Sequence, residues 1–62
     1  MRQREVIVLA ERVFGDKTRA REWLRTPKGK FDGRAPLRLL ATPEGGQRVE
    51  EALVAIDEGY AA

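Results

Sequence analysis

Few side chains in this sequence could carry out catalysis. The 62 residues contain no cysteine and no histidine, which removes thiolate nucleophiles, imidazole bases and the commonest zinc ligands. The carboxylates of Glu50 and Glu51 are neighbours, so on a helix they would point about 100° apart and would not meet at one substrate atom. The sequence has neither a phosphate-binding glycine loop nor a metal-ligand spacing. We therefore expect a protein that is not an enzyme and that holds no cofactor and no metal.

Basic residues are concentrated in the middle of the chain. The net charge is +2, but residues 17–38 hold eight basic and two acidic side chains, whereas residues 39–62 hold one basic and five acidic ones. A stripe with a spacing of four residues, continued into the following loop, consists of Lys17, Arg21, Arg25, Lys28 and Lys30. Such a stripe could bind phosphates, or it could face solvent or an acidic protein partner.

The spacing of the expected helices argues against a helix-turn-helix that binds DNA. About ten residues, with Pro27 among them and Pro36 at the start of the next helix, separate that helix from the one that ends near Arg25, whereas the motif needs a turn of roughly three or four residues. The next helix is also rich in leucine where a recognition helix needs polar side chains. We therefore expect no direct nucleic-acid binding from this chain.

Hydrophobic periodicity predicts an all-α fold, a small bundle of about four helices, two long and two short. These helices are expected over residues 5–14, residues 17–25, a short segment that begins at Pro36, and about residues 43–58. The apolar positions expected to face the interior are Val6, Leu9, Ala10, Val13, Ala20, Trp23, Leu24, Phe31, Val49, Leu53 and Ile56.

Local signals mark where these helices begin and end. Asp16 and Thr42 are expected as N-caps, because their side-chain oxygens can accept backbone N–H groups of the first turn. Gly15 and Gly59 follow the last helical residues, where a left-handed conformation costs glycine little. Pro27 ends the second helix.

Three further features of the sequence, a glycine pair and two aromatic residues, lead to specific predictions. The pair Gly45-Gly46 weakens a helix, so we expect a close approach to it, by a neighbouring helix or, as the alternative, by the backbone of a partner. Trp23 is expected to be the largest anchor of the core. Tyr60 lies beyond Gly59 and has two open interpretations: it caps the end of the bundle, or it inserts into a cleft of a partner.

No segment is expected to enter a membrane. A spanning helix needs about 20 apolar residues, and the apolar run near the start, residues 6–10, has only five. This run is also too short for a secretory signal. We expect a cytoplasmic protein with no membrane partner.

Three stretches in order resemble a known family. They are residues 20–27 (Ala-Arg-Glu-Trp-Leu-Arg-Thr-Pro), residues 33–42 (Gly-Arg-Ala-Pro-Leu-Arg-Leu-Leu-Ala-Thr), and Glu44-Gly45 followed by Val49-Glu50 and by Ile56 and Gly59. Over roughly residues 10–60 the chain is similar to the toxin-binding domain of the Xre/MbcA/ParS-type antitoxins. The sequence departs from the family pattern at Asp32, where a Gly-Gly-Arg turn is usual.

The resemblance implies a bacterial antitoxin whose helical domain binds a RES-domain toxin, an enzyme that degrades NAD. Residues 1–62 would form one toxin-binding domain, without the helix-turn-helix domain that many members carry, and could enter a larger toxin–antitoxin assembly. Arg34 and Pro36 would hold the domain together, with contact to the toxin as the alternative. By position, the segment that blocks the active site would be Glu58, Gly59, Tyr60, Ala61 and Ala62. Asp57 joins them as a toxin-binding residue, because a basic NAD-binding cleft would attract the acidic side chains at this end.

Two interpretations from other classes stay open beside the antitoxin. A small DNA-binding module would use the basic stripe, and its affinity in gel shifts would fall steeply with salt. A helical oligomerisation domain would change its elution volume with concentration in size-exclusion chromatography.

Overall fold

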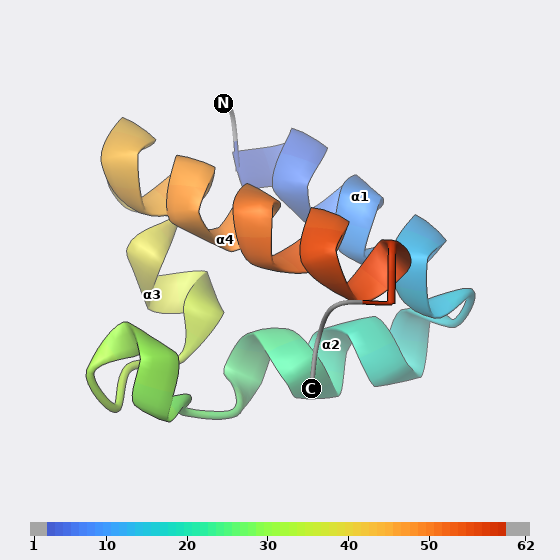
Figure 1. Cartoon of the computed structure of the whole chain (residues 1–62), viewed down its shortest axis with the longest axis horizontal. Coiled ribbons are helices and arrows are strands. Elements are labelled where there is room, and N and C mark those ends of the chain that lie inside the picture. The colour runs from blue at the N-terminus through green and yellow to red at the C-terminus, as the bar shows by residue number, and fades with distance from the viewer. Residues whose placement is uncertain (1–2, 60–62) are drawn as a thin grey trace.

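Four α-helices and one 3-10 turn make up residues 3–59, the part of the chain that the computed structural model describes (Figure 1). The elements are α1 (Gln3–Phe14), α2 (Lys17–Arg25), η1 (Gly29–Phe31), α3 (Pro36–Leu39) and α4 (Pro43–Asp57). The prediction of an all-α bundle with two long and two short helices is therefore confirmed.

The long helices α1 and α4 pack against each other, and α2 packs along α1 (Figure 1). The side-chain amide of Gln3 donates a hydrogen bond of 3.3 Å to the carbonyl oxygen of Leu40, which ties the start of α1 to the turn before α4. As a result α1 and α4 run in the same general direction. The carboxyl end of α4 thus lies at the same end of the molecule as the α1–α2 turn, while η1 and α3 lie at the opposite end.

The predicted caps are confirmed. A carboxylate oxygen of Asp16 accepts the backbone N–H of Thr18 at 3.0 Å, and the hydroxyl of Thr42 accepts the N–H of Gly45 at 3.0 Å. Gly15 and Gly59 both adopt positive φ, 68° and 84°. These contacts satisfy backbone groups that a helix end leaves unpaired, so the helix boundaries follow from local sequence.

The core lies between α1, α2 and α4 and is closed by the loop residue Phe31. Val6 and Ala10 of α1 and Val49 and Leu53 of α4 have no exposed surface. The buried hydrophobic side chains are Val6, Ala10, Ala20, Leu24, Phe31, Leu39, Leu40, Val49, Ala52 and Leu53. Among the predicted core positions, Leu9 and Val13 are only partly buried and pack at its edge, and Ile56 is also only partly buried, because a bundle this small covers only the centre of each apolar stripe.

The expectation that Trp23 anchors the core is wrong. Its side chain is half-buried at the edge of the core, because Ala20 and Leu24 occupy the inward face of α2. The indole packs against the ring of Phe14, with 5.8 Å between centroids and 45° between planes. The Lys28 ammonium lies 5.2 Å from the Trp23 ring centroid, and partial burial there lowers the pKa of Lys28 below its usual value. Trp23 therefore covers the outside of the α1–α2 contact.

The expected close approach at the glycine pair is confirmed. Gly45 and Gly46 are buried in the first turn of α4, and the backbone of Leu39 at the end of α3 lies directly against Gly45. A Cβ atom on Gly45 would overlap the carbonyl oxygen of Leu39 and would lie 2.8 Å from its carbonyl carbon. Only glycine therefore lets α4 begin this close to α3.

We predict that Gly45→Ala destabilises the domain by about 2–3 kcal/mol, because the added methyl meets rigid backbone that cannot move aside. Gly29→Ala is the matched control, since a Cβ there meets no atom within 4 Å, and it should change the free energy of unfolding by less than about 0.5 kcal/mol. Urea denaturation followed by circular dichroism measures both. Equal stability of the two variants would contradict the close contact.

Candidate functional site

The predicted toxin-binding residues begin at the carboxyl end of α4. Asp57 is the last helical residue and Glu58 is the C-cap, whose N–H donates to the carbonyl of Val54 at 2.9 Å. Asp57, Glu58 and Gly59 are all exposed. The other predicted site residues, Tyr60, Ala61 and Ala62, lie outside the described residues. The structure thus brings two carboxylates to one exposed helix end.

This helix end is electrostatically unfavourable for acidic side chains. The carbonyl groups at the end of a helix carry a partial negative charge, which favours Lys or Arg there and disfavours Asp or Glu by roughly 0.3–1 kcal/mol. The last turn of α4 has no basic residue, and Asp57 and Glu58 follow. Acidic residues at the negative end of a helix dipole, with no basic residue in the last turn to offset them, are typical of a functional surface.

The basic stripe expected from sequence is interrupted at Lys28, which is half-buried beside Trp23. Lys30 keeps an exposed side chain. Its main-chain carbonyl accepts a hydrogen bond of 3.1 Å from the Arg48 guanidinium, which also lies 5.4 Å from the centroid of the Phe31 ring. Of the two loop lysines, only Lys30 therefore offers an exposed charge beyond α2.

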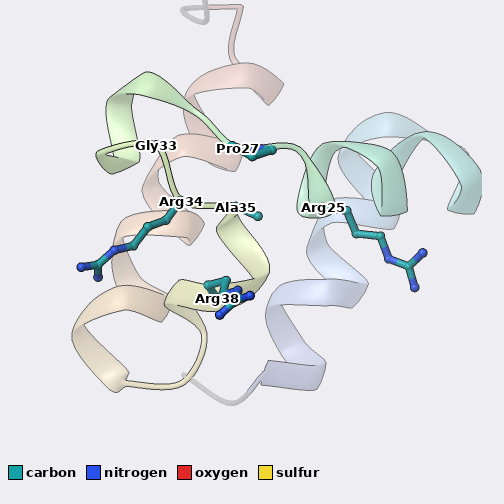
Figure 2. A pocket seen from close by; sticks show the side chains of 6 residues that line it. All are labelled: Arg25, Pro27, Gly33, Arg34, Ala35 and Arg38. Atoms are coloured by element: carbon teal, nitrogen blue, oxygen red, sulfur yellow. The ribbon is translucent and has the colours of Figure 1, made fainter.

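Instead, three arginines surround a groove at the end of α2 (Figure 2). The groove has a volume of about 580 Å³ and is lined by Arg25, Pro27, Gly33, Arg34, Ala35 and Arg38. The side chains of Arg25 and Arg34 point away from each other on the two sides, and Arg38 lies between them (Figure 2). We call this feature the arginine groove. It presents spread positive charge with no acidic residue in its lining.

Sequence reasoning missed this groove because its residues come from three elements. Arg25 ends α2, Arg34 follows η1 and Arg38 lies in α3. The sequence signal that could have indicated the groove was the Asp32-Gly33 turn, because a turn there reverses the chain. Lys28 and Arg34 then pair through their backbones, and the Lys28 N–H donates to the Arg34 carbonyl at 3.1 Å.

The matched turn holds the domain together through Pro36 and through the backbone of Arg34. Pro36 is fully buried at the start of α3. The N–H of Arg34 donates to the Phe31 carbonyl at 3.1 Å, but the side chain of Arg34 is exposed. The expected structural role therefore applies to the Arg34 backbone and not to its guanidinium.

The described part of the chain holds neither a cluster of metal-ligating side chains nor a helix that could span a membrane. Within residues 3–59, no three potential metal-ligating side chains lie together. None of the helices in this range combines the length and the apolar content of a bilayer span.

The fold and its exposed charged ends define a small helical binding domain, and comparison with known proteins gives its family. Residues 9–59 match the antitoxin Xre/MbcA/ParS C-terminal toxin-binding domain. The chain is 42% identical over 59 residues to a protein of Pseudomonas putida (strain KT2440) named antitoxin Xre, an alignment that covers 95% of this chain. No solved structure gives a significant match.

This chain therefore belongs to the family of Xre/MbcA/ParS antitoxin toxin-binding domains. It spans 37% of the length of the Pseudomonas relative. The family is described as the toxin-binding domain of antitoxins, which is a binding role.

We predict different effects for two substitutions in the matched turn. Pro36→Ala should lower the free energy of unfolding by about 1–2 kcal/mol, because it removes buried ring contacts and frees the unfolded backbone. Arg34→Ala should change it by less than about 0.5 kcal/mol, because the guanidinium is exposed. Urea titration measures both, and a large loss of stability in Arg34→Ala would show that its side chain does hold the fold.

Proposed function

We propose that this chain is an antitoxin that binds a RES-domain toxin, an enzyme that degrades NAD, and blocks the entrance of its active site with residues 57–62. The toxin-binding role follows from the family. The choice of toxin and the blocking mechanism rest on the resemblance of the sequence and on the charge at the end of α4. Residues 1–62 act as one toxin-binding domain in this proposal.

The exposed acidic end of α4 carries the proposal. Asp57 and Glu58 add two carboxylates to the negative end of the helix dipole, so negative charge is concentrated at one place on the surface. An enzyme that binds NAD must offer positive charge to the pyrophosphate. The end of α4 is therefore complementary in charge to such a cleft, and the chain that follows it leads directly to Tyr60.

Inhibition of this kind needs no chemistry from the antitoxin. A segment that occupies the entrance excludes the substrate as long as it stays bound, so the residence time of the complex decides how well the toxin is neutralised. Exposed charges contribute mainly by steering the encounter, and this contribution weakens as salt increases.

We predict that deletion of Tyr60–Ala62 relieves inhibition while the helical content stays the same. Helix α4 ends at Asp57, and the carbonyls of Val54 and Ile56 accept the N–H groups of Glu58 and Gly59. The deletion keeps both of these hydrogen bonds. The measurement is NAD depletion by the toxin encoded next to this chain, with circular dichroism as the control for folding. If the shortened chain inhibits fully, residues 60–62 do not block the site.

We predict that Asp57→Asn combined with Glu58→Gln slows association with the toxin by about tenfold at low salt and flattens its salt dependence. The fold should be unchanged or slightly stabilised, because two charges at the unfavourable end of the helix dipole are removed. Stopped-flow association over a salt series measures this. A control with Glu44→Gln, an exposed acid at the opposite end of α4, should associate like the wild type, and an equal effect of both variants would contradict a role specific to the end of α4.

A further inference from the structure

The six residues at the carboxyl end are too few for a stable complex by themselves. A standard protein interface buries about 800 Å² on each partner and involves roughly 20–30 residues a side, whereas the proposed blocking segment has residues 57–62 only. Most of the contact with the toxin must therefore come from another surface of the domain.

An apolar hollow lies beside the arginine groove, between α1, α2 and α3. It has a volume of about 170 Å³ and is lined by Ile7, Glu11, Lys17, Ala20, Arg21, Leu24 and Leu37. Leu37 is 41% exposed, although it is one of the larger apolar side chains. The hollow and the groove are both lined by residues of the same two helices, Leu24 and Arg25 of α2 and Leu37 and Arg38 of α3. We call this combined surface the α2–α3 face.

We propose that the α2–α3 face is a second contact with the toxin, and that it binds a segment carrying acidic side chains beside an apolar one. This inference rests on the proposed partner but not on the blocking mechanism. Carboxylates would pair with the arginines of the groove, and an apolar side chain would fill the hollow beside Leu37.

The charges of the face are free to make such pairs. In the part of the chain that the structure describes, Arg25, Arg34 and Arg38 have no hydrogen bond through their side chains and no ion pair. A guanidinium can bind a carboxylate through two parallel hydrogen bonds, so a partner gains these contacts without breaking any within the domain. Lys17 and Arg21 add positive charge at the rim, where Glu11 is the single acid of the lining.

The hollow favours a protein over a nucleic acid. A phosphate backbone would pair with the arginines, but it would leave Leu37 and the hollow in contact with water. A protein segment would cover both, and burial of apolar surface at the centre of an interface is where most binding energy arises.

The face is also accessible while the end of α4 is engaged. Lys17 begins α2 directly after the α1–α2 turn, at the same end of the molecule as the end of α4 (Figure 1). From there α2 runs back toward the arginine groove. One large partner can therefore contact the end of α4 and extend along α2.

The test compares two double charge reversals in the full chain, with the toxin encoded next to it as the probe. Arg25→Glu with Arg38→Glu changes the face, and Arg4→Glu with Arg12→Glu changes α1 outside it; all four residues are exposed. Each pair changes the net charge from +2 to −2, since every exchange removes two units. We expect the face variant to bind the toxin at least about 30-fold more weakly and the control to lose less than about threefold, with unchanged circular dichroism and melting in both.

A second variant separates the apolar contact from charge. Leu37→Ser should weaken binding by about tenfold without changing its salt dependence, because the side chain is uncharged. Equal weakening by the face and control reversals, or no weakening by the face reversal and by Leu37→Ser, would overturn the proposal.

Two further measurements decide between this partner and other occupants. If the face reversal abolishes a gel shift with a 20-base-pair duplex (about two helical turns) but leaves the affinity for the toxin unchanged, the face is a nucleic-acid surface and the proposal fails. If it abolishes self-association in sedimentation and leaves toxin binding unchanged, the face binds a second copy and the proposal also fails.

The chain without Tyr60–Ala62 separates the two proposals. If the blocking mechanism is wrong and the face is right, this chain inhibits normally and the face reversal still weakens its binding. If the face is wrong, the face reversal binds like the wild type, whatever the deletion does to inhibition.

Discussion

The close contact between α3 and α4 is the constraint on which the rest of this domain depends. The backbone of Leu39 lies against Gly45, so α4 begins immediately beside the end of α3. From that start, Val49 and Leu53 reach the interior opposite Val6 and Ala10, and none of these four side chains keeps exposed surface. A chain of 62 residues without cysteine has no covalent link to replace this packing.

The same packing distributes the charges of the molecule. Because α1 and α4 run in the same general direction, the acidic end of α4 lies away from the arginines at the end of α2, after η1 and in α3. Among residues 3–59, no ion pair neutralises either set of charges, so both are available to a partner. Separated surfaces of opposite sign are a means of orienting an encounter, which suits a domain whose family binds toxins.

In the proposed complex, inhibition comes from contact between surfaces and needs no chemistry from this domain. A toxin-binding domain of this size can present only a few elements, and each of them has an exposed feature: the carboxylates at the end of α4, the arginine groove, and Leu37 in its apolar hollow. In the proposed complex, a short segment blocks the catalytic entrance while a broader face supplies the affinity. Such a division would let blocking and affinity be altered separately by substitution.

The sequence by itself determined the helices and their ends, since caps such as Asp16 and Thr42, glycines such as Gly15, and the apolar periods act within one turn of the chain. It also indicated the family and a close approach at Gly45. Only the tertiary structure decided that Trp23 lies at the edge of the core, that Lys28 packs on it, and that Arg25, Arg34 and Arg38 share one groove. These outcomes depend on how separate elements pack in three dimensions, and neither the size of the core nor the meeting of side chains distant in sequence follows from local periodicity.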